Sequence, residues 1–360
     1  MKILSVFYIP SGGVETLVRQ RSKSLKSKGI VSHFLYYRPG AGTQNSEDPT
    51  FVSNHNPSIK RLIQREQYDV IIVNSDFTFL PRARNLGFQG KLIYEVQGLG
   101  SFRQAEATLS AAKPYVDAYV DAVLMPKTPH LIELVHHYFP SKPTFSFHNC
   151  LDTKQFAYVH HLSPEKHSII GWVGRLEENK NWRLFLDICA GLVRFSPQLK
   201  FWIFTDDSLN SAAEKAAFHQ KAQQLQLLNR ITVYSNVPHR KMPVYYSRIG
   251  NSGGFLLSTS NVEGFGYAII EAMACLCPFI CSDSDGVKSF VFHNKTGKLF
   301  PRNNAQQAIQ EAIALFSNPD LKQNIRLNGQ KYIQDHFSLE AYAENFANML
   351  KALGFTMPQP

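Results

Sequence analysis

Short runs of apolar residues alternate with longer segments of helical periodicity along the first half of the chain. The first apolar run covers residues 3–9, and helical spacing of apolar positions follows over residues 12–28 until Gly29 stops it. After a polar loop over residues 39–58, a helix is predicted near residues 59–66. Five further strands are predicted at residues 31–37, 69–73, 91–96, 122–125 and 144–147. Such alternation, with strands this apolar, is typical of a parallel sheet covered by helices on both faces.

The same alternation restarts after a polar segment, residues 152–166, which is predicted to be a linker. The predicted strands here are residues 168–173, 201–204, 231–234 and 254–257, and the predicted helices are residues 182–194 and 212–228. We therefore expect an α/β protein of two facing, doubly wound, Rossmann-like parallel-sheet domains, residues 1–160 and 161–338, with an interdomain cleft. A C-terminal helix in residues 339–360 is expected to pack back on the first domain. In such folds, ligands bind at the carboxyl ends of the strands.

The composition excludes several classes of protein. With 360 residues, 44% of them hydrophobic and 18% charged, the chain is too apolar for a disordered protein and too long for a small disulfide scaffold. Its first apolar run ends at Pro10, too early for a signal peptide, and no window approaches the ~20 apolar residues of a membrane span. The cysteines are odd in number, and Cys275, Cys277 and Cys281 lie in an apolar run, which favours buried thiols over a metal site. These features predict a cytoplasmic protein.

The net charge of +10 predicts attraction to anionic partners. The densest basic run lies in the predicted helix at residues 12–28 and consists of Arg19, Arg21, Lys23, Lys26 and Lys28. A helix of this kind either docks on an anionic membrane surface, such as the inner face of the cell membrane, or has an ordinary solvated face. Nucleic acid is not an expected partner, because acidic residues are mixed with the basic ones and no basic-aromatic groove pattern occurs.

The most informative segment, residues 258–274, leaves an apolar strand, passes through a glycine-bearing turn and enters a helix. Unpaired backbone amides at the start of that helix, around residues 264–267, would direct their partial positive charge towards an anion. The glycines of the turn let a ligand approach the backbone closely. Glu263 in the turn and Glu271 in the helix can line the same cleft, where carboxylates suit the paired hydroxyls of a ribose or a sugar.

A second segment, residues 171–181, repeats the order of strand end, glycine and cations before a helix. Arg175 and Lys180 flank a turn there and can converge on a diphosphate, the arginine as a bidentate fork and the lysine as a point charge. Gly12 and Gly13 follow the first strand but lack the third glycine of a dinucleotide fingerprint, so a nicotinamide site is not favoured.

At these residues the chain resembles glycosyltransferase family 4, a large retaining group with the GT-B architecture. Four stretches carry the resemblance: the family's Glu-x7-Glu motif, its Gly-Arg-x4-Lys motif, its first glycine loop and the segment between its two domains. In this sequence they are Glu263 with Glu271, Gly174-Arg175 with Lys180, Gly12-Gly13, and Asn149-Cys150-Leu151-Asp152 with Phe156. Cys150 stands where the family has glycine, which bears on the local shape of that loop.

The resemblance implies roles for these residues. Arg175 and Lys180 would bind the diphosphate of the sugar donor and stabilise it as it leaves, without a metal ion. Glu271 would hold the nucleotide ribose, and Glu263 would hold hydroxyls of the transferred sugar. The nucleotide side of the site would be lined by Gly12, Gly13, Gly174, Gly264, Phe265 and Gly266. Retention would follow from same-face attack, in which the donor phosphate helps to deprotonate the acceptor hydroxyl.

One departure from the family touches the chemistry. Many relatives carry His-Gly after the fourth strand, where the imidazole sits by the reacting sugar, whereas this sequence has Gln97-Gly98. A glutamine exchanges hydrogen bonds but cannot become a cation. Either Gln97 only positions the sugar, or another group such as Glu95 helps.

We therefore expect a retaining glycosyltransferase that uses a nucleotide-sugar, typically a UDP-sugar, and no further cofactor. The expected acceptor is a hydroxyl of a cell-surface glycan or a lipid-linked saccharide. The alternative is a non-catalytic GT-B protein that binds a glycan or a partner, which the glutamine at position 97 favours. The intact Arg175, Lys180, Glu263 and Glu271 argue against this alternative, because a protein released from catalysis has no need of them.

Overall fold

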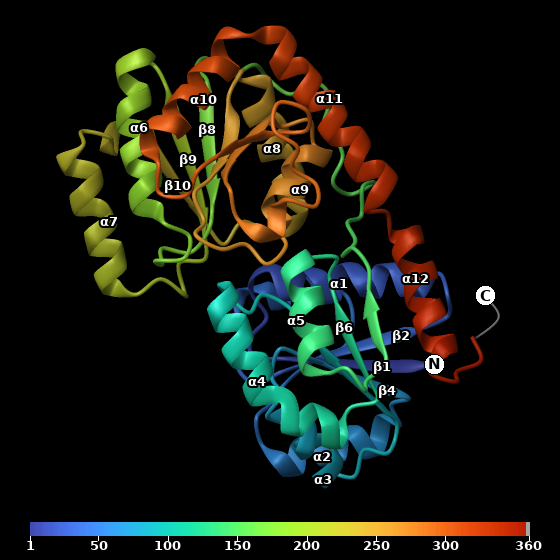
Figure 1. Ribbon diagram of the computed structural model, residues 1–360. Helices are drawn as coiled ribbons and strands as arrows, with labels where there is room; N and C mark the ends of the chain where they lie inside the picture. The colour runs from blue at the N-terminus through green and yellow to red at the C-terminus, as the bar shows by residue number, and fades with distance from the viewer. Residues whose placement is uncertain (358–360) are drawn as a thin grey trace. The chain divides into compact units, whose positions relative to one another are not determined.

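A computed structural model of the chain describes residues 1–357, apart from the side chain of Asp285. The chain folds into two compact units. Unit 1 consists of Met1–Asp152 together with the segment from Phe337 onwards, and unit 2 consists of Thr153–His336. Each unit is an α/β fold around one parallel sheet (Figure 1), which confirms the predicted fold class.

Unit 1 is built on a seven-stranded parallel sheet with the order β3-β2-β1-β4-β5-β6-β7. The order starts in the middle and moves outwards in both directions, as in doubly wound folds. The strands are β1 Lys2–Phe7, β2 Val31–Tyr36, β3 Thr50–Val52, β4 Val70–Asn74, β5 Lys91–Glu95, β6 Ala122–Met125 and β7 Thr144–Ser146. The helices are α1 Gly12–Lys26, α2 Asn56–Glu66, α3 Phe79–Asn85, α4 Phe102–Tyr119, α5 Pro129–Tyr138 and α12 Leu339–Ala352.

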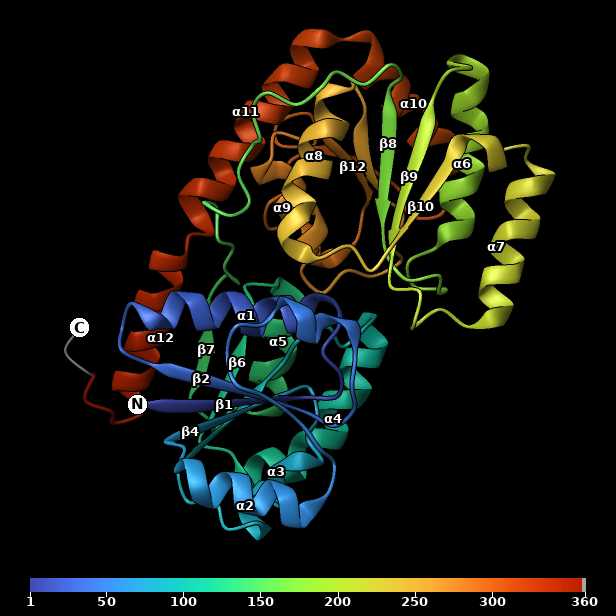
Figure 2. The same ribbon diagram turned by 180° about the vertical axis from the view of Figure 1, so that it is seen from behind.

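Alternate residues of the central strands enter two different cores, because successive side chains of a strand point to opposite faces of its sheet. Leu4 and Ile71 pack in a core that also contains apolar residues of α2, α3, α4 and α5. Ile3 and Ile72 pack in the opposite core, which contains Leu25 at the end of α1 and several residues of α12. The helices α1 and α12 lie side by side (Figure 2). The C-terminal helix thus covers part of the sheet of unit 1.

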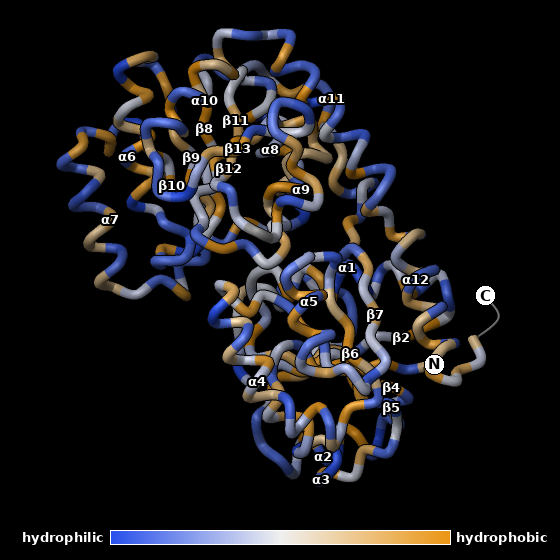
Figure 3. Tube along the Cα trace, in the orientation of Figure 1, coloured by the Kyte–Doolittle hydropathy of each residue, from blue (hydrophilic) through white to orange (hydrophobic). Residues whose placement is uncertain are grey.

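Unit 2 is built on a six-stranded parallel sheet with the order β10-β9-β8-β11-β12-β13. The strands are β8 Ile169–Val173, β9 Lys200–Thr205, β10 Ile231–Ser235, β11 Phe255–Ser258, β12 Phe279–Ser282 and β13 Lys298–Phe300. The helices are α6 Trp182–Phe195, α7 Ala212–Gln224, α8 Met242–Asn251, α9 Tyr267–Ala274, α10 Ala305–Ser317 and α11 Pro319–His336. Helix α7 carries both hydrophilic and hydrophobic residues (Figure 3) and buries only Phe218 and Ala222. The strand β8, by contrast, is apolar and almost wholly buried.

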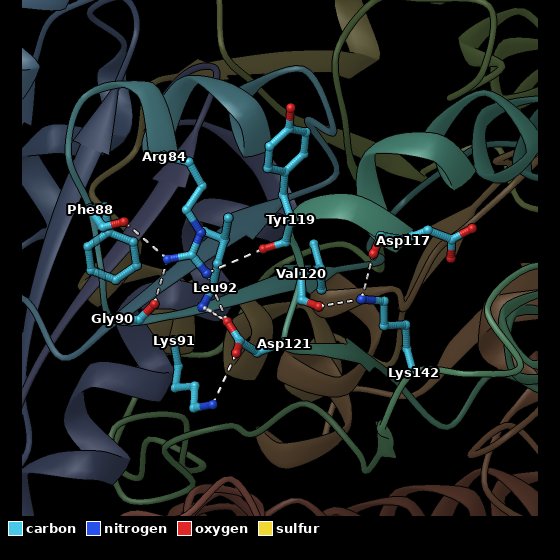
Figure 4. A network of polar contacts seen from close by, with 10 residues as sticks. All are labelled: Arg84, Phe88, Gly90, Lys91, Leu92, Asp117, Tyr119, Val120, Asp121 and Lys142. Atoms are coloured by element: carbon cyan, nitrogen blue, oxygen red, sulfur yellow. Dashed lines mark hydrogen bonds and ion pairs between the residues drawn. The ribbon is translucent and has the colours of Figure 1, made fainter.

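A polar network fixes the register of β5 and β6 at their amino ends (Figure 4). The carboxylate of Asp121, the residue before β6, accepts hydrogen bonds from the Leu92 amide at 2.9 Å, from Lys91 Nζ at 3.0 Å and from Arg84 Nη2 at 3.0 Å. Burial alone would raise the pKa of Asp121, but the Leu92 amide and the two cations outweigh it and lower that pKa. A register held at the amino ends also sets where the loops leave the carboxyl ends of these strands.

The state of the cysteines and the length and apolar character of the helices can be compared with what the composition led us to expect. All five cysteines are buried and none forms a disulfide, as their position in apolar runs indicated. Within residues 1–357, no helix combines the length and the apolar character needed to cross a bilayer.

Candidate functional site

The loops after β8 and β11 meet at the carboxyl edge of the sheet of unit 2, because these two strands are neighbours. Thr259, just after β11, joins the loops: its hydroxyl accepts from Trp172 Nε1 at 3.1 Å and lies 2.9 Å from the Lys180 carbonyl. The Asn261 amide also donates to the Asn179 carbonyl at 2.8 Å. These contacts bring the two sequence motifs, one around Lys180 and one around Glu263, into a single site.

Lys180 and Glu263 form an ion pair at the centre of this site. Lys180 Nζ lies 2.6 Å from Glu263 Oε1, and the same oxygen accepts from Ser260 Oγ at 2.6 Å. Both side chains are only partly exposed, so water screens the pair incompletely. Each partner therefore holds the other in place at the carboxyl edge. Ser260 was not predicted as a site residue.

Arg175 leaves β8 towards solvent and is held loosely. Its Nη2 lies 3.0 Å from Glu177 Oε1, and its side chain is 49% exposed. Exposed ion pairs of this kind contribute little free energy, so the guanidinium is free to turn towards a stronger anion such as a phosphate. Gly174 is closely packed: a Cβ there would lie 3.1 Å from Lys180 Cγ and 2.9 Å from the Trp172 ring. The glycine makes room for the lysine stem.

The glycine-bearing turn before α9 has the backbone shape that the motif predicted. Gly266 adopts the left-handed conformation, with φ of 81°, and immediately precedes the first turn of the helix. Gly286 packs against the turn, and a Cβ there would lie 2.0 Å from the Glu263 carbonyl. The Phe265 ring is buried between Tyr267 and Phe290. Only the backbone of Phe265, and not its ring, is therefore placed to meet a ligand.

Glu271 is more enclosed than the sequence indicated. The residue is 3% exposed; Oε1 lies 2.7 Å from His239 Nε2, and Oε2 accepts from the Tyr246 hydroxyl at 3.0 Å. Burial and the charge of Glu271 raise the pKa of Tyr246 well above its usual range, so its hydroxyl stays a donor. The His239 ring lies 4.7 Å from that of Phe156. The carboxylate is thus held on both oxygens, and each oxygen keeps a further lone pair for a ligand hydroxyl.

Sequence reasoning missed His239 and Tyr246, and for a physical reason. Tyr246 lies on α8 and reads as one of its apolar residues, since its ring is buried. His239 stands in a short turn between β10 and α8 with no motif around it. Only the folded chain shows that both side chains converge on a carboxylate in α9.

In unit 1, Gln97 follows β5 and is buried, with both hydrogens of its side-chain amide engaged. Its Nε2 donates to Glu95 Oε1 at 3.2 Å and to Asn149 Oδ1 at 3.2 Å, and its Oε1 accepts from Asn149 Nδ2 at 3.3 Å. Both amide hydrogens are used, so only the carbonyl oxygen has capacity left. Gln97 therefore offers a ligand an acceptor, where an imidazolium would offer a donor.

Glu95 is committed to a buried ion pair. Its Oε1 lies 2.5 Å from Arg21 Nη2, both side chains are 1% exposed, and Arg21 Nε donates to the Tyr342 hydroxyl of α12 at 2.8 Å. Burial would lower the pKa of Arg21, but the charge of Glu95 outweighs it and raises that pKa, so the guanidinium stays charged. The carboxylate of Glu95 serves as its counter-charge, which argues against the idea that Glu95 acts on the sugar.

The basic run of α1 is largely neutralised inside unit 1, which corrects the expectation of an anionic docking face. Arg19 and Arg21 are buried, which rules them out of any membrane contact. The five cations pair with Glu15, Glu95, Asp152, Asp48 and Glu344, in chain order. The apolar spacing of the sequence did not show that α1 packs on the sheet and also lies beside α12, so that two sides of the helix are buried. Gly12, at the start of α1, has φ of 78° and open space where a Cβ would stand, and Gly13 follows it in the first turn of the helix.

The comparisons with known proteins point to one family. Residues 154–332 match the family model described as glycosyl transferases group 1. The poly(ribitol-phosphate) alpha-N-acetylglucosaminyltransferase of Staphylococcus aureus is 22% identical over 213 residues, which cover 58% of this chain and 41% of that protein. The alpha-D-kanosaminyltransferase of Streptomyces kanamyceticus is 23% identical over 186 residues, covering 52% of this chain and 46% of that protein. The matches thus span less than half the length of either relative.

Among solved structures, HepE of Anabaena in complex with UDP and glucose superposes with a TM-score of 0.81. The superposition covers 98% of this chain and 100% of that one, at 18% sequence identity. At this identity the likeness shows the GT-B fold.

Proposed function

Because residues 154–332 place this chain in the glycosyl transferases group 1 family, we propose that the protein transfers a sugar from a nucleotide-sugar to a hydroxyl acceptor. The observation that carries this proposal is the convergence of Lys180, Glu263 and the glycine turn before α9 at one sheet edge of unit 2. A cation, a carboxylate and the backbone amides at the start of a helix are the groups that a sugar diphosphate needs. The likeness to HepE, solved with UDP and glucose, supports a UDP-sugar as the donor.

The roles of the residues follow from their chemistry. Lys180 and Arg175 meet the diphosphate, whose negative charge grows as the sugar leaves, and they supply this charge stabilisation without a metal ion. Glu271 holds the ribose hydroxyls through its remaining lone pairs, and His239 and Tyr246 keep its carboxylate in position. Glu263 holds hydroxyls of the transferred sugar. The amides of residues 264–266 face the phosphate at the start of α9.

The contacts of the two carboxylates support a proposal for the stereochemistry. The two carboxylates near the sugar are both engaged, Glu263 by Lys180 and Ser260, and Glu271 by His239 and Tyr246. In the proposed roles both carboxylates bind hydroxyls of the donor, so neither is left to attack the reacting carbon and form a covalent intermediate. We therefore favour attack on the face that the donor phosphate leaves, with that phosphate accepting the acceptor's proton. The configuration of the sugar would be retained.

We propose a saccharide of the cell surface, free or lipid-linked, as the acceptor. The support comes from relatives named for capsular polysaccharide biosynthesis in Staphylococcus aureus and for lipopolysaccharide core biosynthesis in Rhizobium leguminosarum. The second candidate function is binding of a glycan without transfer. It is favoured by Gln97, since an amide with both hydrogens engaged cannot donate to the reacting sugar.

Thermal unfolding in the presence of UDP, GDP, CDP and ADP tests the proposal. A ligand that binds only the folded state raises its stability by RT ln(1 + [L]/Kd), about 2.7 kcal/mol at a hundredfold excess over Kd. We expect UDP to raise Tm most and Lys180→Met to reduce that rise. Lys221→Met is the matched control, because Lys221 forms a comparable ion pair with Asp187 elsewhere in unit 2. A Tm that no nucleotide changes would contradict the proposal. Release of UDP from a bound UDP-sugar then separates transfer from mere binding.

A further inference from the structure

An aromatic side chain at the carboxyl edge of the sheet in unit 1 is exposed and yet firmly held. Tyr8, the residue after β1, is 41% exposed. Its ring lies edge-on to Phe7 at 5.4 Å and to Tyr37, just after β2, at 5.7 Å. Its carbonyl also accepts from the Tyr37 amide at 3.2 Å. The ring is therefore fixed by two aromatic contacts and by its own backbone.

The hydroxyl of Tyr8 is turned towards a buried carboxylate. Burial, the charge of Asp76 and a hydrogen bond to it raise the pKa of Tyr8 to about 12. Asp76 is 5% exposed and also accepts from the Tyr37 hydroxyl at 2.6 Å and from the Thr78 amide at 3.0 Å. The Tyr8 hydroxyl uses its one hydrogen on Asp76, so Tyr8 offers its surroundings mainly the carbon surface of its ring.

The turn that carries Asp76 also holds Gln97. Ser75 has φ of 61°, a conformation that is costly for a residue other than glycine. In that conformation its Oγ donates to the Gln97 carbonyl at 2.5 Å and accepts from the Gln97 amide at 3.3 Å. Ser75 therefore holds Gln97, a polar acceptor, and the next residue, Asp76, holds the exposed ring of Tyr8. Strain of this kind persists where the surrounding structure enforces it, often at functional sites.

We infer that Tyr8 is a platform for a pyranose ring of the acceptor saccharide, at the same edge of the sheet of unit 1 as Gln97. A pyranose has an apolar face of C–H groups, which stacks on the electron-rich face of an aromatic ring, while its rim of hydroxyls needs acceptors such as Gln97 Oε1. Single exposed aromatic residues are common on surfaces. Tyr8 differs because its hydroxyl is anchored on a buried carboxylate, Asp76, and the residue before that carboxylate, Ser75, holds the predicted site residue Gln97. This inference rests on the proposed function and narrows the acceptor to a cyclic sugar.

Saturation-transfer NMR on the full chain with UDP present tests the inference. The probes are the methyl glycosides of glucose, galactose, mannose and N-acetylglucosamine, with ribitol as an open-chain polyol that has hydroxyls but no flat C–H face. We expect transfer to the C–H protons of at least one glycoside and weaker transfer to ribitol. Tyr8→Ala should weaken glycoside binding by about fivefold to tenfold, the size expected for one aromatic contact. Tyr8→Phe keeps the ring and should lose less.

Phe195→Ala is the matched control, because Phe195 is a similarly exposed aromatic residue, 47% exposed, at the end of α6 in unit 2. It should bind the glycosides as the wild type does. Equal glycoside binding by the wild type and Tyr8→Ala, preferential binding of ribitol, or no transfer to any glycoside would each overturn the inference. UDP affinity measured in the same samples reports on unit 2 alone. A lack of UDP binding would contradict the proposed donor site. The difference in glycoside binding between the wild type and Tyr8→Ala decides whether Tyr8 is the acceptor platform.

Discussion

At the level of single residues, the contact between Lys180 and Glu263 governs what each can do when a sugar donor arrives. The two atoms lie 2.6 Å apart, and Ser260 shares the same carboxylate oxygen. A diphosphate would draw the ammonium away from the carboxylate, which then becomes available for sugar hydroxyls. The ion pair thus keeps both charged side chains ordered at the sheet edge, and each can still exchange its partner for a ligand.

The first prediction concerns the two cations of the donor site. Lys180→Met and Arg175→Ala should each lower kcat by about a hundredfold or more, with a smaller effect on the KM for the donor, because the charge they stabilise is largest in the transition state. Steady-state release of UDP from the UDP-sugar measures both constants, and Lys221→Met should behave as wild type. A variant that loses only donor affinity at unchanged kcat would remove that cation from the chemistry.

The second prediction concerns Gln97, whose amide does not titrate. The pH profile of kcat should show no inflection from this position, and Gln97→His should keep activity while gaining an inflection near the ordinary histidine pKa of about 6.5. Gln97→Ala should lose activity, because it removes the acceptor oxygen. A histidine variant that folds but has no activity would show that the surroundings of position 97 have been rebuilt around the amide.

At the level of elements, the apolar pattern of the sequence predicted most of the strands and several of the helices. The strands β1, β4, β8 and β9 and the helix α6 lie where the sequence placed them, since long apolar or periodic segments leave little choice of structure. Three short strands escaped prediction: β3 lies within the polar segment over residues 39–58, and β12 and β13 were not identified, although the equally short β6, β7 and β11 were. A run of three or four residues can be identified as a strand only where it stands out from the residues around it.

Helices α1 and α12 show that a run of basic residues does not by itself identify an exposed helix face. Such a run suggests an exposed surface, yet Arg21 is fully enclosed because α12 lies against α1 and contributes Tyr342. No pattern in the sequence around Arg21 shows that a helix more than three hundred residues later will supply its hydrogen-bond acceptor. The buried pair of Arg21 and Glu95 holds Gln97 from one side, so α12 also supports the candidate site.

The third prediction tests this support. Arg21→Met should destabilise the protein by about 3–5 kcal/mol, because it leaves Glu95 buried without its counter-charge. Urea unfolding measures the change, and adding Glu95→Gln to the same variant should recover part of it. Lys28→Met is the control on the same helix pair, since Lys28 pairs with Glu344 near the surface, and its midpoint should match the wild type. An Arg21→Met variant as stable as wild type would contradict the described burial.

The fourth prediction uses the Asp121 network to give a pH dependence. The pKa of Asp121 is lowered in the folded protein, so its contribution to stability is present above its unfolded pKa of about 3.9 and is lost as pH falls through the folded value. Asp121→Asn should therefore destabilise unit 1 at pH 7, by about 1 kcal/mol for such a partly exposed group. The gap to wild type should narrow as unfolding is followed towards pH 3. A gap that is constant with pH would contradict the lowered pKa.

At the level of the whole molecule, the sequence motifs indicated which residues meet in the candidate site of unit 2, whereas the residues that support them emerged only from the fold. Lys180, Glu263 and the glycine turn lie in loops that follow strand ends, and Glu271 lies in the helix that the second loop enters. His239, Tyr246 and Ser260 were not, because their contacts depend on side chains brought together from separate elements. The net charge of +10 was a poor guide to a surface, because the densest basic run is paired within unit 1.

The most direct test of the central claim, that unit 2 holds a nucleotide-sugar site, is calorimetric titration of UDP and of UDP-glucose into three proteins. These are the wild type, Glu271→Gln and Glu263→Gln. The account predicts that the wild type binds both ligands and that Glu271→Gln weakens both, because both carry the ribose. Glu263→Gln should bind UDP as the wild type does and lose affinity only for UDP-glucose. A wild type that binds neither ligand, or equal losses for both ligands in both variants, would contradict it.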